Sequence, residues 1–117
     1  MTYATRAMVK ERLGIPLSDA TEDTVVDSKL ASADAEVDNV LGGYTTVPLT
    51  GTIPQIVKEV AADLAAALFR EDRNPKDEMV VVWRTRAKRN LDDYVARLYR
   101  PSPYSKATAY AVIEEDS

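Results

Sequence analysis

The amino-acid sequence predicts an all-α protein, in which a small four-helix, bundle-like domain is followed by an extended C-terminal arm. Apolar residues recur at spacings of three and four, which is the period of an amphipathic helix. Glycine and proline interrupt these segments where helices are expected to end or begin, most clearly at Gly14, Gly42-Gly43 and Pro75. The chain has 117 residues, which is the size of one ordinary domain.

The first two helices are predicted near residues 6–13 and 21–41. Thr5 is suited to cap the first helix, and Gly14 ends it. The second helix carries an apolar stripe at spacings of four, three, four and three to four, and Gly42-Gly43 ends that helix. The stripe consists of Val26, Leu30, Ala33, Val37, and Val40 or Leu41.

The third helix is predicted to begin at the segment Thr52-Ile53-Pro54-Gln55. Thr52 is suited to cap it, Pro54 lies in the first turn, and Gln55 completes a capping box. Its apolar stripe is predicted at Ile53, Val57, Val60, Leu64 and Leu68, with alanines crowded at 61, 62, 65, 66 and 67. Because small side chains let another helix approach closely, we expect this helix to be the central one.

Asn74-Pro75 is predicted to begin the fourth helix, with Asn74 as its cap and Pro75 in the first helical position. Asp77 and Glu78 follow in the first turn, near the positive end of the helix dipole. The inward residues are predicted to be Val80, Trp83, Ala87, Leu91, Tyr94 and Leu98. Trp83, the only tryptophan, is expected to anchor this helix in the core, with an exposed interface anchor as the alternative.

Pro101 and Pro103 forbid continuation of the fourth helix. We therefore place the helical domain at residues 1–100 and the extended arm at 101–117. The arm contains residues with β propensity but cannot form a sheet alone, so it is predicted either to be disordered or to pair with a partner's edge. Its apolar and aromatic residues are predicted to contact a subunit or partner; they are Tyr104, Tyr110 and Ile113.

The composition excludes several kinds of chemistry. The chain has no cysteine and no histidine, which rules out disulfides, thiolate zinc sites, iron–sulfur clusters, a cysteine nucleophile and the Ser-His-Asp triad. Asp34 and Asp38 lie one helical turn apart, but without histidine they are interpreted as a solvated helix face rather than a metal site. We expect no enzymatic activity, no cofactor and no metal.

The charge is unevenly distributed. The whole chain has a net charge of −4, whereas residues 73–100 carry eight basic and four acidic side chains, a net charge of +4. Four basic residues cluster in the predicted fourth helix, at Arg84, Arg86, Lys88 and Arg89. They are predicted to meet a subunit or partner; the alternatives are solvated pairing with nearby acidic residues, or contact with nucleic-acid phosphates. No apolar run reaches the ~20 residues of a membrane-spanning helix, so no membrane association is expected.

Several short motifs occur in a distinctive order along the chain. They are Tyr3-Ala4-Thr5, Val9, Leu13-Gly14, Ala31-Ser32, Val37-Asp38-Asn39-Val40-Leu41, Tyr44, Pro48-Leu49, Ile53-Pro54, Ile56-Val57-Lys58, Ala61, Leu64-Ala65 and Leu68. Over residues 3–98 this order resembles the small helical head–tail connector proteins of tailed bacteriophages. The chain departs from the family at Gly42-Gly43, where many relatives carry a basic residue.

The resemblance implies a structural role in the virion. Connectors of this class form a ring, often of twelve copies, beneath the portal protein, and they bridge it to a stopper or tail-completion protein. DNA passes through the ring without specific binding. The implied location is the head–tail interface of the virion, and the host cytoplasm during assembly. A nucleic-acid-binding regulator that uses the basic fourth helix is the alternative; its binding would weaken steeply with salt. An enzyme with a carboxylate site and a helical module of some other assembly stay open as further possibilities.

Overall fold

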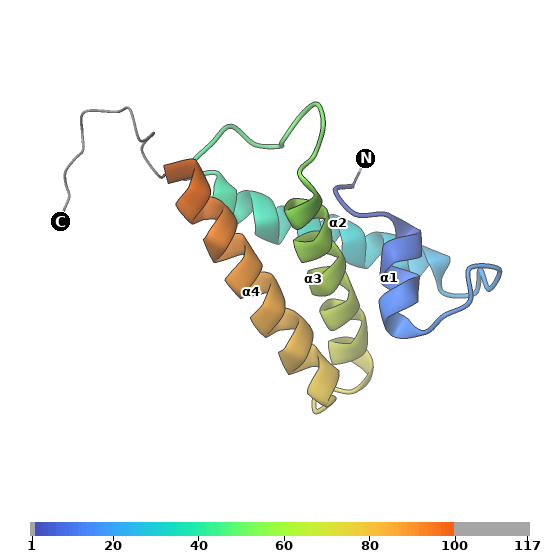
Figure 1. Ribbon diagram of the computed structural model, residues 1–117. Coiled ribbons are helices and arrows are strands. Elements are labelled where there is room, and N and C mark those ends of the chain that lie inside the picture. The colour runs from blue at the N-terminus through green and yellow to red at the C-terminus, as the bar shows by residue number, and fades with distance from the viewer. Residues whose placement is uncertain (1, 100–117) are drawn as a thin grey trace, which may run out of the picture.

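The computed structural model describes residues 2–99, and all of their regular structure is helical. The helices are α1 (Arg6–Leu13), α2 (Asp23–Leu41), α3 (Gln55–Arg73) and α4 (Glu78–Tyr99). In Figure 1, α3 and α4 form an antiparallel hairpin, α2 runs across behind it, and α1 lies on the other side of α3 from α4. The all-α, four-helix prediction is therefore confirmed. The predicted arm and its boundary at residue 100 lie outside the described residues and stay predictions.

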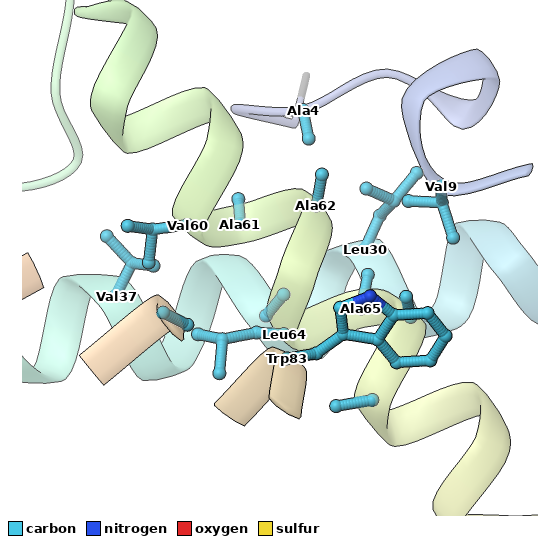
Figure 2. Close-up of a cluster of buried hydrophobic side chains, with 14 of the residues drawn as sticks. Ala4, Val9, Leu30, Val37, Val60, Ala61, Ala62, Leu64, Ala65 and Trp83 are labelled. Carbon is cyan, nitrogen blue, oxygen red and sulfur yellow. The ribbon is translucent and has the colours of Figure 1, made fainter. Parts of the chain in front are cut away.

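Helix α3 is the central helix, as its alanine content predicts. It packs against each of the other three helices. Its buried residues face all directions around the helix axis; they are Val57, Val60, Ala61, Ala62, Asp63, Leu64, Ala65, Ala66, Ala67 and Phe69. Figure 2 shows part of this core, where side chains from the N-terminal segment, α1, α2 and α4 surround α3. Residues 61–67 are all buried, and five of these seven are alanine, which lets the other helices approach α3 closely.

The predicted cap of α1 is confirmed. The Thr5 hydroxyl accepts a hydrogen bond of 3.2 Å from the Met8 backbone N–H. Gly14 ends the helix in the left-handed conformation, with a φ of 73°, which favours glycine because it has no Cβ. Helix α2 begins two residues later than the sequence indicates, at Asp23, and no side chain caps it. Its predicted stripe is buried, and Leu41 rather than Val40 completes it.

The predicted capping box of α3 is wrong. The helix begins at Gln55, so Pro54 occupies the N-cap position and no side chain caps the helix. Pro54 has extended backbone, with a ψ of 141°, which leaves Thr52 two residues outside the N-cap. The Gln55 side chain instead donates a hydrogen bond of 2.7 Å to Glu59 one turn ahead.

The predicted start of α4 is also wrong. Asn74-Pro75 forms a turn between α3 and α4, closed by a hydrogen bond of 3.0 Å from the Asp77 N–H to the Asn74 carbonyl. Asp77 then caps α4, because its carboxylate accepts a hydrogen bond of 2.8 Å from the Met79 N–H. Two antiparallel helices need a reversal between them, and this turn supplies it.

The inward face of α4 follows the prediction over most of its length. Val80, Trp83, Ala87 and Leu91 are buried, so Trp83 is a core anchor. The Arg70 guanidinium lies over the Trp83 ring, 5.7 Å from its centroid. Tyr94 is half-buried and Leu98 is 40% exposed, where α4 lies farther from α3 than at its start (Figure 1). The expectation that Leu98 points into the core is therefore wrong.

The N-terminal segment is anchored through Tyr3. Its phenolic oxygen donates a hydrogen bond to Asp38 of α2 and accepts one of 2.8 Å from the Leu49 N–H in the connection between α2 and α3. The Tyr3 N–H donates to both carboxylate oxygens of Asp34, at 3.2 Å each. The interpretation of Asp34 and Asp38 as a solvated face is therefore wrong, because both carboxylates bind Tyr3.

Candidate functional site

The basic residues predicted as an interface on α4 have different surroundings in the structure. Arg84 reaches Glu71 of α3 at 2.7 Å and Glu36 of α2 at 3.9 Å. Lys88 pairs with Asp92 one turn ahead on its own helix, at 2.9 Å. Arg84 thus connects α4 to α3 and α2 through partly exposed ion pairs, while the pair of Lys88 and Asp92 is more exposed still.

Arg86 binds a buried carboxylate. Its Nε and Nη2 atoms donate hydrogen bonds of 2.8 and 2.7 Å to the two oxygens of Asp63 on α3. Asp63 has no exposed surface. Arg12 of α1 donates a further hydrogen bond of 2.6 Å from its Nε to the same carboxylate, and it also binds Glu59. One carboxylate therefore joins α1, α3 and α4.

The pKa values of Arg86, Arg12 and Glu59 all shift toward the charged form of the group. The hydrogen bond to Asp63 raises the pKa of Arg86 above its ordinary value. Burial lowers the pKa of Arg12, but the hydrogen bonds to Asp63 and Glu59 outweigh that effect, and the net shift is upward. The Arg12 hydrogen bond also lowers the pKa of Glu59. These are the shifts expected of groups that serve as structural ion pairs.

Asp63 is the residue that reasoning from the sequence missed. It lies between Val60-Ala61-Ala62 and Leu64-Ala65, as a single acidic residue within an apolar stretch. A charged residue in such a position is rarely buried unless it is paired. That isolation was the available signal, and the arginines at 12 and 86 were candidate partners.

The face of α4 that points away from α3 is open. This outer face consists of Glu78, Val81, Val82, Thr85 and Arg89, all of them exposed. Val81 is 66% exposed and Val82 is 47% exposed. Within the part of the chain that the structure describes, neither Glu78 nor Arg89 forms an ion pair. Arg89 is thus the member of the predicted basic cluster that is left available for another molecule.

A groove adjoins this face between α2 and α4. It has a volume of about 410 Å³, with Leu64, Ala87 and Leu91 among its apolar lining residues. Val40 of α2, which is 40% exposed, also lines it, and Glu36 and Lys88 are among its charged lining residues. The lining is thus half apolar and half charged, because Arg84 and Asp92 also belong to it.

Metal clusters and membrane-spanning helices are not found among the described residues. Between residues 2 and 99, no group of three or more acidic side chains is placed to hold a metal ion. No helix in the same range is long and apolar enough to cross a membrane. The remaining predicted contact residues, Tyr104, Tyr110 and Ile113, lie outside the described residues.

Fold and surface together define a small all-helical protein with an open helix face. The chain belongs to the family described as Bacteriophage Mu, Gp36, whose model matches residues 3–100. It is therefore a bacteriophage protein, and the match spans all four helices. No curated protein and no solved structure matches the chain.

Proposed function

We propose that this protein is a structural head–tail connector of the virion. It forms a ring, of about twelve copies by its resemblance to connectors, beneath the portal. It bridges the portal to the stopper or tail-completion protein around the DNA exit channel. The observation that carries the proposal is membership of a bacteriophage family over residues 3–100, the same part of the chain in which the connector motifs occur in order.

The internal ion pairs support a role as a rigid building block. Asp63 joins α1, α3 and α4, and Arg84 adds α2 through Glu36. Ion pairs also connect α1 to the start of α2, where Lys10 is buried against Asp23 at 2.7 Å. A subunit that must keep its shape while DNA moves past it benefits from such cross-links.

The charge distribution supports a channel that does not hold DNA tightly. The chain has a net charge of −4, and Arg84, Arg86 and Lys88 already have acidic partners within the molecule. Tight binding to DNA depends on basic side chains that are free to replace counterions at phosphates. The proposed partners are accordingly proteins, and the contacts are assigned to Arg89 and to the arm residues Tyr104, Tyr110 and Ile113.

The test is the copy number of this protein in purified phage particles. Quantitative mass spectrometry with isotope-labelled peptides would count it against the portal and major capsid proteins of the same particles. A connector is present at about a dozen copies in DNA-filled particles, because its ring matches a single vertex. Absence from filled particles would overturn the proposal, as would a copy number that follows the capsid lattice.

Variants then test the proposed contacts. Arg89→Glu is expected to reduce the yield of infectious particles in a complementation assay, whereas Lys76→Glu, in the exposed turn before α4, is the matched charge reversal. Filled heads without tails are the expected product of a failed connector. Equal titres for both variants would remove Arg89 from the proposed interface.

A further inference from the structure

The outer face of α4 is uncovered in the subunit described here. Helix α4 packs mainly against α3, and the side chains of its buried face are used there. On the opposite side, Val81 and Val82 expose apolar surface next to Thr85. In Figure 1 this helix lies at the edge of the molecule, on the far side of α3 from α1. Nothing within residues 2–99 covers these side chains.

The spacing of the outer face matches a helix-pairing seam. Glu78, Val82, Thr85 and Arg89 follow one another at intervals of four, three and four. This is the spacing of the a and d positions at which two helices pack side by side in a coiled coil. The seam is short, about three helical turns, and its apolar part is its centre.

The charges on this seam are self-complementary. Its N-terminal end is acidic at Glu78 and its C-terminal end is basic at Arg89, and neither has an ion-pair partner in the described chain. If two copies of α4 run antiparallel about a two-fold axis midway between Trp83 and Arg84, position 78 of one copy lies opposite position 89 of the other. In the same register, Val82 lies opposite Thr85. The dimer then contains two pairs of Glu78 with Arg89, one at each end of the seam, and the apolar centre is covered.

We propose that the outer face of α4 binds a second copy of this chain, with the two α4 helices antiparallel. The pair is weak and reversible, because the seam is shorter than a standard interface requires. The inference goes beyond the connector proposal and does not rest on it. A two-fold pair closes on itself, whereas a ring needs two different surfaces on each subunit.

The first experiment is sedimentation velocity of the full chain over a concentration series from about 1 to 500 μM, the range in which weak interfaces assemble. The wild type is expected to shift from monomer to dimer. Glu78→Arg and Arg89→Glu are each expected to raise the dimer dissociation constant about tenfold, since each change places like charges opposite one another twice. The double variant restores the opposite charges and is expected to return the constant toward the wild-type value. Glu11→Arg on exposed α1 is the matched control.

The second experiment tests the register. The chain contains no cysteine, so single cysteines can be introduced without competing thiols. A mixture of Val82→Cys and Thr85→Cys is expected to form a cross-linked dimer under mild oxidation. Ala96→Cys, also exposed on α4, is the control that should cross-link more slowly. Helical circular dichroism and the melting temperature confirm that each variant is folded.

The outcomes separate this inference from the connector proposal. A protein that stays monomeric at all concentrations overturns the pairing. The pairing is also overturned if neither charge reversal changes the dissociation constant of the oligomer. Cross-linking of the Val82→Cys and Thr85→Cys mixture no faster than the control overturns the antiparallel register. The copy number in virions is independent of all three results, so either proposal can fail while the other stands. The titre of Arg89→Glu does not separate them, because both proposals assign a contact to Arg89.

Discussion

Asp63 carries a negative charge in the interior because arginines from two other helices reach it. Removing a carboxylate from water costs free energy, and the hydrogen bonds of Arg12 and Arg86 offset that cost. Removing one member of this group of ion pairs is then expected to lower the free energy of unfolding more than replacing the whole group by apolar residues. The remaining charges lose their compensation while their positions in the fold stay the same.

Asp63→Asn is expected to destabilise the protein by about 3 kcal/mol, because it leaves Arg12 and Arg86 beside a neutral amide in a buried position. Urea unfolding followed by the fluorescence of Trp83, the only tryptophan, measures the change. Asp92→Asn is the matched control, since Asp92 pairs with Lys88 at the surface and such pairs contribute little. Equal stabilities for the two variants would contradict the structural role of Asp63.

The stability of the protein is expected to fall as the solution is acidified. Hydrogen bonds from Arg73, Arg6 and Arg12 lower the pKa values of Glu22, Asp27 and Glu59, and the Met79 N–H with Arg70 lowers that of Asp77. A carboxylate whose pKa is lower in the folded state stabilises that state above its unfolded pKa, and the contribution is lost as the pH falls through the folded pKa. The free energy of unfolding should therefore decrease between about pH 5 and pH 2.

Asp34 acts in the opposite direction. Burial raises its pKa, so its ionised form costs stability, and that cost is relieved as the pH falls. Unfolding measured at a series of pH values tests the balance, and Glu59→Gln should flatten the acid slope relative to the wild type. A stability that stays constant or rises below pH 4 would show that the carboxylates with lowered pKa values, which include Asp19 through its hydrogen bonds from Thr21, do not dominate.

At the scale of the element, α3 depends on its alanines. Ala62 has no exposed surface and points toward Ala4 of the N-terminal segment, as Figure 2 shows. Its small side chain allows that segment to lie close to α3, next to the anchored Tyr3. An alanine on an exposed helix face could be replaced by a larger residue with little loss of stability.

Ala62→Leu is expected to cost about 1–3 kcal/mol of stability, because the added side chain has no space between α3 and the N-terminal segment. Chemical denaturation gives the size of the effect, and amide hydrogen exchange shows whether α1 loses protection first. Ala96→Leu makes the same change on the exposed part of α4 and should leave stability nearly unchanged. If both variants are equally stable, close packing at Ala62 is not required.

At the scale of the whole molecule, the distribution of charge decides what the protein can bind. We expect no measurable affinity for a short DNA duplex at about 0.15 M salt, because most basic residues of α4 are paired internally. Fluorescence anisotropy with labelled duplex over a salt series measures it. Tight binding that weakens steeply with salt would instead favour the nucleic-acid-binding alternative.

Much of the fold could be predicted because it depends on local chemistry. The Thr5 cap, Gly14 and the buried stripe of α2 follow from residue type and helical period alone. The starts of α3 and α4 were misplaced because several residues could cap each helix, and the choice depends on how the connection approaches it. Pro54 occupies the N-cap position of α3 in place of Thr52, and Asp77 caps α4 in place of Asn74.

The candidate surface was predictable only in part. Basic residues on α4 were identified, but the sequence could not distinguish Arg86, which binds Asp63, from Arg89, which has no ion-pair partner among residues 2–99. That distinction depends on which face of α4 meets α3 and on where Asp63 lies across the interface. The contacts predicted for the arm remain predictions.

The sequence by itself determined the helical class, the order of the four helices, most of the buried apolar positions and the assignment to a bacteriophage protein. These properties depend on the period of the apolar residues, on the positions of glycine and proline, and on short motifs of consecutive residues. Only the tertiary structure decided that Asp63 and Lys10 are buried, that Tyr3 binds Asp38 and that the outer face of α4 is open. The reason is physical: burial and ion pairing join residues that are far apart in the chain, as Arg12 and Asp63 are, and the packing of the helices brings them together.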